Sequence, residues 1–215
     1  MIQRKRFGGK VEKIIRDGGI GIIPTDTIYG MVGSAMSKKA VNRIYKLRFR
    51  DSKKPFIILI SSLNDLARFN IKTDSETKKI LNCFWPGKVS IVLPCSSKEF
   101  LYLHPVRSKP PLAAADVQTH RTSNGVHRGA KTLAFRMPKD KDLIELIKKT
   151  GPLVAPSANP EGLPPAKTIK QAKKYFGDNV DFYVGVRKLS GRPSTLIKIN
   201  GDKVVVLRQG VVKIK

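Results

Sequence analysis

Residues 18–33 read GGIGIIPTDTIYGMVG, and this stretch decides the fold. The apolar run from Ile20 to Ile23 predicts a short buried strand. The strand should end at Pro24, because proline has no amide hydrogen to donate to a neighbouring strand. A buried strand that opens into a polar, glycine-flanked turn is a common ligand-binding element of α/β proteins. An ordinary strand–loop–helix joint gives the same pattern, so both interpretations stay open here.

The rest of the chain alternates between helical and strand patterns. Helices are predicted over residues 10–17, 38–47, 142–149 and 168–176, and after the N-cap residues Ser62 and Asp74. Strands are predicted over residues 55–60, 89–93, 131–137, 153–155, 181–184, 195–199 and 203–207, with a hairpin turn at residues 200–202. Residues 55–60 (PFIILI) are apolar throughout, which is typical of a mixed or parallel sheet covered by helices. The pattern predicts an α/β fold, and 215 residues suit one domain over residues 1–215.

Charge is the strongest feature of the composition. The chain has 42 Lys and Arg against 16 Asp and Glu, a formal net charge of +26. Such an excess attracts polyanions such as RNA, or phosphorylated substrates. The lysines are scattered along the chain, so a solvated lysine-rich surface without a nucleic-acid partner is the alternative.

Targeting and metal-binding patterns are missing from the sequence. No apolar run approaches the roughly 18–20 residues of a membrane-spanning helix, and MIQRKRFGGK at the N-terminus lacks the apolar segment of a signal peptide. We therefore expect a cytoplasmic protein without a membrane partner. Cys83 and Cys95 do not have metal-ligand spacing and are expected to be free thiols.

Residues 104–129 fit none of the predicted elements. The segment has no sustained apolar period and is rich in Pro, Ser, Asn and Gly. Because structureless loops of this length are uncommon in compact domains, we interpret it as a flexible insertion. It contains all three histidines but no convergent set of ligands at short spacing, so no metal site is expected.

Four polar clusters stand near the ends of predicted strands and helices, where open α/β sheets bind ligands. They are Lys46 with Arg48, residues 155–159 (APSAN), Thr132 with Arg136, and Ser194–Thr195 with residues 208–210 (RQG). Each has an ordinary alternative: two solvated cations, a Ser/Asn turn, the solvated face of an edge strand, or a polar hairpin end. Lys46 and Arg48 diverge by about 200° on a regular helix, so they converge only if the helix ends near Leu47.

Read together, these clusters resemble the YrdC/TsaC family. The motifs that occur in the family's order are PTDTIYGMVG (24–33), Lys46-x-Arg48, Lys54-Pro55-Phe56, FWPGKVSIVLP (84–94), TLAFRMP (132–138), APSAN (155–159), PST (193–195) and LRQG (207–210). The resemblance covers nearly everything except the segment around residues 104–129. It implies a single YrdC-like domain, with a twisted mixed β-sheet and flanking helices around a deep basic cavity.

The resemblance also implies an activity, that of an L-threonylcarbamoyladenylate synthase. Such an enzyme is a nucleotidyltransferase that converts L-threonine, bicarbonate or CO2, and ATP into threonylcarbamoyl-AMP and pyrophosphate. Its product serves the transferase machinery that modifies adenosine 37 of tRNA to N6-threonylcarbamoyladenosine, so tRNA contact through the basic surface is expected. ATP is expected to bind with Mg2+. The alternative is a non-catalytic RNA-binding or ribosome-associated module of the same fold.

Site residues are carried over from the matched motifs. The family's catalytic positions match Lys46, Arg48, Ser157 and Asn159. Its ATP positions match Arg48, Lys54, Thr132, Ser157 and Arg208, with Lys53 competing for the role of Lys54. Its threonine positions match Thr25, Arg136, the Ala155 backbone and Ser194. Arg136 suits a carboxylate because a guanidinium offers two parallel hydrogen bonds. Asp26 would repel an anionic ligand, so we expect it to point away or to pair with a cation.

Overall fold

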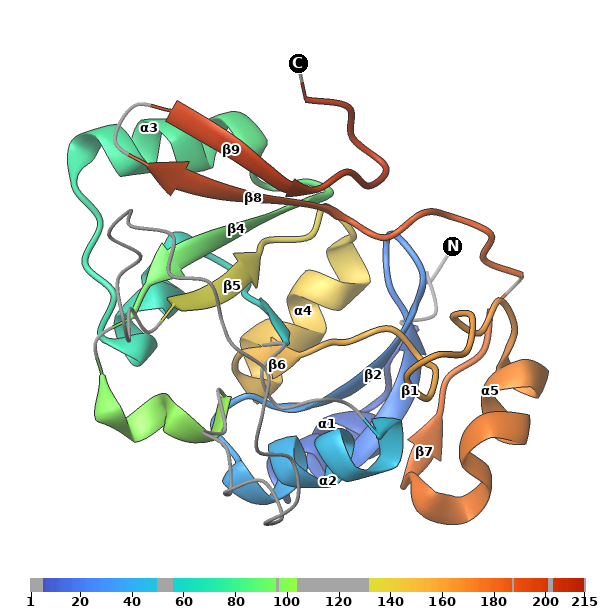
Figure 1. The fold of residues 1–215 in the computed structure, drawn as a ribbon. Helices are drawn as coiled ribbons and strands as arrows, with labels where there is room; N and C mark the ends of the chain where they lie inside the picture. Colours follow the sequence, from blue (N-terminus) through green and yellow to red (C-terminus); the bar gives the residue numbers. More distant parts are fainter. Residues whose placement is uncertain are drawn as a thin grey trace, which may run out of the picture.

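One mixed sheet organises the molecule. The computed structural model describes residues 6–49, 56–95, 97–103, 132–186, 188–200 and 203–214. Within these ranges the strands form a nine-stranded sheet in the order β7–β1–β2–β6–β3–β5–β4–β8–β9 (Figure 1). Three neighbouring pairs, β1–β7, β3–β5 and β4–β8, are parallel, and the others are antiparallel. The predicted α/β class with a mixed sheet is confirmed.

The strands are short, and most lie where the sequence predicts them. They are β1 (Ile20–Pro24), β2 (Tyr29–Ser34), β3 (Ile57–Leu59), β4 (Val89–Pro94), β5 (Thr132–Arg136), β6 (Leu153–Val154), β7 (Phe182–Tyr183), β8 (Thr195–Asn200) and β9 (Lys203–Arg208). β2 was missed. It pairs with β1 as a hairpin, so Tyr29 and Gly30 belong to a strand rather than to the turn.

Four of the five α-helices in the described residues begin at a side chain that caps their first turn, and α1, which follows Gly8, does not. The helices are α1 (Gly9–Arg16), α2 (Lys38–Arg48), α3 (Ser75–Phe84), α4 (Lys141–Thr150) and α5 (Ile169–Phe176), with 3-10 turns η1 (Leu63–Phe69), η2 (Lys98–Leu103) and η3 (Gly177–Asn179). The Ser37 side chain accepts from the Ala40 amide, which fixes the start of α2. Asp74 accepts from the Thr77 amide in the same way at α3.

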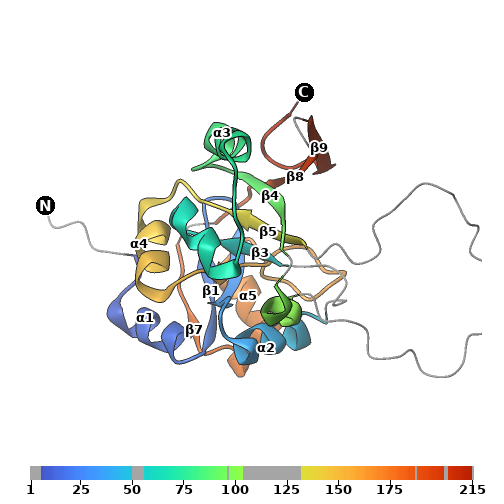
Figure 2. The same ribbon diagram turned by 90° about the vertical axis from the view of Figure 1, so that its left-hand side faces the viewer.

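Apolar residues pack on both faces of the sheet. On one face Ile23 and Val32 pack with Leu143 and Ile147 of α4 and with Ile15 of α1. The opposite core takes the alternate residues of the same hairpin together with the apolar side of α2. Figure 2 shows α1 and α4 on one side of β1 and α2 on the other. A strand buried on both faces must be apolar throughout, which explains the continuous run in β1.

β7 is tied to β1 by a side chain next to it. Asp181 Oδ2 accepts hydrogen bonds from the Ile20 amide, at 2.7 Å, and from Arg43 Nη1 of α2, at 2.6 Å. Arg43 also donates to the carbonyl of Asn179, at 2.6 Å. One carboxylate thus joins the first strand, the second helix and the segment that leads into β7.

Two compositional expectations can be compared with the structure. Cys83 is exposed, and Cys95 is buried, where its Sγ donates to the Phe69 carbonyl, at 3.5 Å. Among the described residues, no helix combines the length and the apolar character that crossing a membrane requires. The predicted insertion at residues 104–129 lies outside the described residues.

Candidate functional site

The turn between β1 and β2 is organised by Thr25. Its Oγ1 donates to the Ile28 carbonyl, at 2.7 Å, and accepts from the amides of Thr27 and Ile28, at 3.2 and 3.3 Å. The Thr25 amide donates to the same Ile28 carbonyl, at 3.2 Å. A hydroxyl that bonds to backbone groups two and three residues ahead stabilises a tight turn. The turn therefore holds Asp26 in a fixed place at the end of β1.

Asp26 pairs with a cation from the middle of the sheet. Arg136 Nη1 lies 2.5 Å from Asp26 Oδ1, and the side chains are only 4% and 8% exposed, respectively. This is one of the two arrangements expected for Asp26. Arg136 ends β5, which lies between β3 and β4. The alternative of a solvated edge strand is therefore wrong for Thr132 and Arg136.

Arg48 is buried and holds residues 155–159. Its Nε donates to the Asn159 carbonyl, at 2.9 Å, and its Nη2 donates to Ser157 Oγ, at 3.1 Å, and to Asn159 Oδ1, at 3.3 Å. The helix runs through Arg48 and ends at Phe49, which takes the left-handed conformation with φ of 49°. A cation in the last turn also suits the negative end of the helix dipole. Arg48 thus converges with Ser157 and Asn159 although it lies inside the helix.

Lys46 does not join this group. Because α2 continues through Arg48, the two side chains leave different sides of the helix, and Lys46 is exposed where Arg48 is 2% exposed. The convergence that required a helix end near Leu47 therefore does not occur. A long lysine side chain on the exposed side can still move toward a bound anion.

The β2 strand joins the Thr25 turn to residues 155–159. Gly30 and Ser157 form an isolated antiparallel β-bridge. A Cβ added to Gly30 would lie 3.3 Å from Thr25 Cγ2 and 3.4 Å from the Pro156 carbonyl oxygen. Glycine therefore permits close packing of the two segments. The turn that carries Thr25 and residues 155–159 therefore both lie against Gly30.

A third group comes from the C-terminal hairpin. Ser194 Oγ and Ser90 Oγ are 2.8 Å apart, and both side chains are buried. Arg208 Nη2 donates to the Ser194 carbonyl, at 2.9 Å. Ser90 is in β4, and β4 pairs with β5, the strand that ends at Arg136. Ser194 is thereby tied to the strand that neighbours β5.

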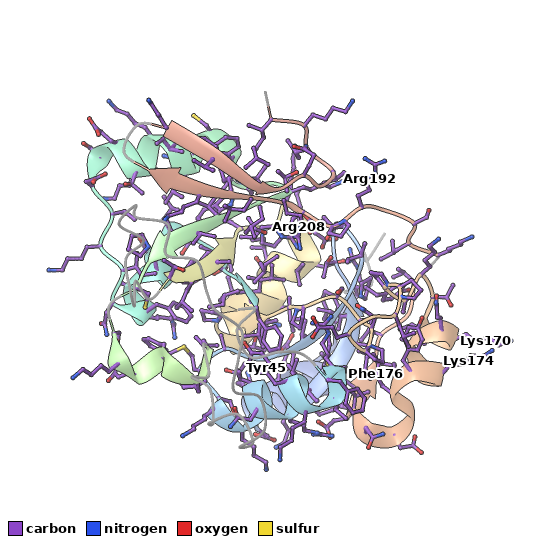
Figure 3. All side chains as sticks on the ribbon, in the orientation of Figure 1. Tyr45, Lys170, Lys174, Phe176, Arg192 and Arg208 are labelled. Atoms are coloured by element: carbon purple, nitrogen blue, oxygen red, sulfur yellow. The ribbon has the colours of Figure 1, made fainter. Side chains whose placement is uncertain are left out.

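Figure 3 shows how the exposed arginines of this region lie. Arg208 is at the end of β9, the edge strand of the sheet, whereas Arg192 is on the segment that precedes β8. Both are exposed. A Cβ on Gly210 would come within 2.4 Å of the Pro193 carbonyl oxygen, so the chain after β9 packs directly on the Ser194 segment.

The remaining predicted site residues are Thr132, Ala155, Lys53 and Lys54. Thr132 is half-buried at the start of β5, and the Ala155 amide donates to the Ile57 carbonyl, at 2.9 Å. That amide is already used, so only the carbonyl of Ala155 could meet a ligand. Lys53 and Lys54 lie outside the described residues. Ser90 was missed from sequence, although a lone serine inside the apolar run VSIVLP is a signal that could have marked it.

The chain is similar to known proteins over most of its length. The Sua5/YciO/YrdC family model, described as "Telomere recombination", matches residues 13–210. A protein of Methanocaldococcus jannaschii is 28% identical over 214 residues, which cover 99% of this chain and 90% of the relative. The threonylcarbamoyl-AMP synthase of Bacillus subtilis is 30% identical over 199 residues, which cover 92% of this chain and 51% of the relative.

A solved structure agrees with the sequence matches. The crystal structure of Pyrococcus abyssi Sua5 complexed with L-threonine matches with a TM-score of 0.74 and 26% identity, over 94% of this chain and 53% of that one. The chain therefore spans about half the length of the Bacillus and Pyrococcus proteins. Since the family model matches most of the chain and the fold agrees, the chain belongs to the Sua5/YciO/YrdC family.

Proposed function

We propose that this protein is a threonylcarbamoyl-AMP synthase, a nucleotidyltransferase that uses L-threonine, bicarbonate or CO2, and ATP. The main support is the convergence of Arg48 with Ser157 and Asn159, next to the turn that carries Thr25. Family membership and the threonine complex of a relative support the substrate.

The proposed chemistry needs cations and hydrogen-bond donors more than a nucleophilic side chain. The threonine amine attacks CO2 to give a carbamate. A carbamate oxygen then forms a bond to the α-phosphorus of ATP, and the bond to the β-phosphate breaks with its electrons leaving on pyrophosphate. Negative charge develops on the carbamate, the phosphoryl oxygens and the leaving group. Preorganised positive groups therefore stabilise the transition state.

Threonine is proposed to bind near the β1–β2 turn. Arg136 would take the carboxylate, with Thr25, the Ala155 backbone and Ser194 around the rest of the molecule. This grouping is supported by Thr25 and Ala155, which lie beside Gly30, and by the ion pair that joins Arg136 to Asp26, the residue after Thr25. The hydrogen bonds that now hold Thr25 and Ser194 keep their side chains in fixed rotamers, which lowers the entropic cost of binding.

ATP is proposed to bind on the side of Arg48 and Ser157. Thr132, Arg208 and Lys54 would contact the nucleotide or its phosphates, and Lys46 would turn inward to the phosphates together with Arg48. Mg2+ would enter with ATP, because phosphate oxygens are among the hard oxygen ligands that Mg2+ prefers. The ligands together would fill the deep basic cavity that the family resemblance implies.

The wider role is also a proposal. The product would pass to the machinery that makes N6-threonylcarbamoyladenosine in tRNA, in the cytoplasm, and the net charge of +26 favours tRNA contact.

We further propose that residues 1–215 form one domain and that residues 104–129 are a dispensable insertion. Deleting 104–129 should then leave folding and activity intact, and a loss of either would disprove it.

Pyrophosphate release tests the activity. Purified protein with ATP should release pyrophosphate only when both L-threonine and bicarbonate are present. Omitting either substrate is the control for contaminating ATPases. Release that does not depend on threonine, or no release at all, would reject the proposed function.

A further inference from the structure

The Asp26–Arg136 pair has hydrogen-bonding capacity that the protein does not use. Only Nη1 and Oδ1 join the two side chains. Asp26 Oδ2 and Arg136 Nε are buried and have no hydrogen-bond partner among the described residues. Native proteins leave few buried polar atoms unsatisfied, and each such atom needs an explanation. A pair that served only to stabilise the fold would gain from using both oxygens in a forked contact.

The electrostatics of the pair select a particular kind of ligand. Asp26 neutralises Arg136, so a simple anion that approached Arg136 would gain little and would be repelled by the adjacent carboxylate. A zwitterion can pair with both Asp26 and Arg136. Its carboxylate can face the unused donors of Arg136, and its ammonium group can donate to Asp26 Oδ2. Hydrogen bonds between charged groups in a buried site are stronger than those between neutral groups.

We propose that Asp26 accepts a hydrogen bond from the α-ammonium group of the amino-acid substrate, so that Asp26 and Arg136 recognise an α-amino acid as a zwitterion. This inference rests on the proposed function, which supplies an amino acid as substrate. Asp26 is then a binding residue that determines specificity, where the sequence alone assigned it no contact with ligand.

Asp26 also favours release of the substrate nitrogen once that nitrogen has reacted with CO2. The ammonium group first loses a proton to water, and the resulting amine attacks CO2 and loses a second proton to water. R–NH3+ and CO2 thus become R–NH–COO−, and the positive charge that Asp26 attracts disappears. Asp26 then repels the new carbamate oxygens. Arg48, which donates to Ser157 opposite Gly30, attracts those oxygens toward ATP.

Entry of the ligand requires a local movement. The segment before β8 covers the turn that carries Asp26, because a Cβ on Gly191 would lie 2.4 Å from the Thr27 carbonyl oxygen. Either this segment or the Asp26 side chain must shift to expose Oδ2.

Calorimetric binding to the full chain tests the inference. The ligands are L-threonine and 3-hydroxybutanoate, which keeps the carboxylate and hydroxyl and lacks the amine. Wild type should prefer L-threonine by about tenfold or more, the value of one hydrogen bond between charged groups. Asp26→Asn should lose most of this preference and raise the KM for threonine, while the KM for ATP changes less than about twofold.

Asp181→Asn is the matched control, since it also removes the carboxylate of an Asp–Arg pair, at 2.6 Å, on another part of the sheet. It should keep the wild-type preference. The double variant Asp26→Asn/Arg136→Gln removes both charges, which avoids an uncompensated buried cation, and it too should lose the preference.

The outcomes separate the two proposals. A wild type that releases threonine-dependent pyrophosphate but binds both ligands equally overturns the zwitterion inference alone, whether or not the variants fold. So does a folded Asp26→Asn protein with the wild-type preference. A wild type that prefers L-threonine yet never releases threonine-dependent pyrophosphate overturns the proposed function instead.

Discussion

Arg48 and Ser157 are separated by 109 residues in the sequence, yet Arg48 Nη2 donates to Ser157 Oγ at 3.1 Å. The same guanidinium donates to two oxygens of Asn159. The Arg48 side chain therefore links the end of α2 to residues 157–159, which follow β6. It serves the fold in the absence of any ligand, and it is also the cation proposed to meet ATP.

Replacing Arg48 should cost stability as well as activity. Arg48→Ala removes a buried cation and leaves three oxygen acceptors without their donor, so we expect a loss of about 3 kcal/mol in unfolding free energy. For a chain of this size, this corresponds to a fall of about 6–12 °C in melting temperature. Differential scanning calorimetry measures it. A melting temperature unchanged from wild type would show that these contacts are absent in solution.

Lys46→Ala should behave differently. Lys46 is exposed, so its removal should change the unfolding free energy by less than about 0.5 kcal/mol. If it meets the phosphates, pyrophosphate release should fall by about tenfold or more. Lys38→Ala removes another exposed lysine of the same helix and should leave both quantities near wild type. Equal activity of the two variants would remove Lys46 from the site.

Asp181 should make stability depend on acid pH. Burial alone would raise the pKa of Asp181, but hydrogen bonds from Arg43 and the Ile20 amide outweigh it and hold the pKa below its ordinary value of 3.8. A carboxylate whose pKa is lower in the folded state stabilises the protein above its unfolded pKa, and this contribution is lost as the pH falls through the folded pKa.

Asp181→Asn tests this dependence. Because the pair is partly exposed, the difference in unfolding free energy from wild type should be about 0.5–1 kcal/mol at neutral pH. It should shrink as the pH falls below 3.8. Urea unfolding at several pH values measures it, with Asp17→Asn, which breaks the exposed pair with Lys13, as control at neutral pH. A difference that grows in acid would contradict the assignment.

Gly210 should not tolerate a side chain. A Cβ there would lie 2.4 Å from the Pro193 carbonyl oxygen and 2.4 Å from the Ser194 carbonyl carbon, and backbone atoms cannot rotate away. Gly210→Ala should cost about 1–3 kcal/mol and raise the KM for threonine through the displaced Ser194. Gly9 is the first residue of α1, and a Cβ added there would have no neighbouring atom within 4 Å. Gly9→Ala should therefore be neutral or stabilising. Similar stabilities of the two variants would show that the C-terminal packing is loose.

Local patterns predicted the elements, because the caps act over a few residues. Ser37, Asp74 and Thr168 each accept the backbone hydrogen bond that starts a helix. β2 was missed because its sequence, YGMVGS, contains two glycines and follows a turn. Its strand conformation comes from pairing with β1 on one side and β6 on the other, which no local propensity encodes.

The site was predicted in composition but not in geometry. The family motifs grouped Lys46 and Arg48 with Ser157 and Asn159, and the structure brings Arg48, but not the exposed Lys46, to the other two. The Asp26–Arg136 pair depends on a contact between β1 and β5 across three intervening strands, β2, β6 and β3. Periodicity placed Arg136 on a polar face, but whether that face is central or at an edge is decided by sheet order, which depends on the whole chain.

The parallel pairing of β4 with β8 has a consequence for how the protein is made. Val89 pairs with Thr195, so β4 keeps one open edge until the residues around 195 have left the ribosome. Pairings this distant in sequence slow folding, because the loop must close before the contacts form. Ser194 and Arg208 arrive with the same late strands. A nascent chain therefore acquires Ser194 and Arg208, two of the residues proposed to contact threonine and ATP, after Thr25, Arg48 and the other proposed contacts are already present.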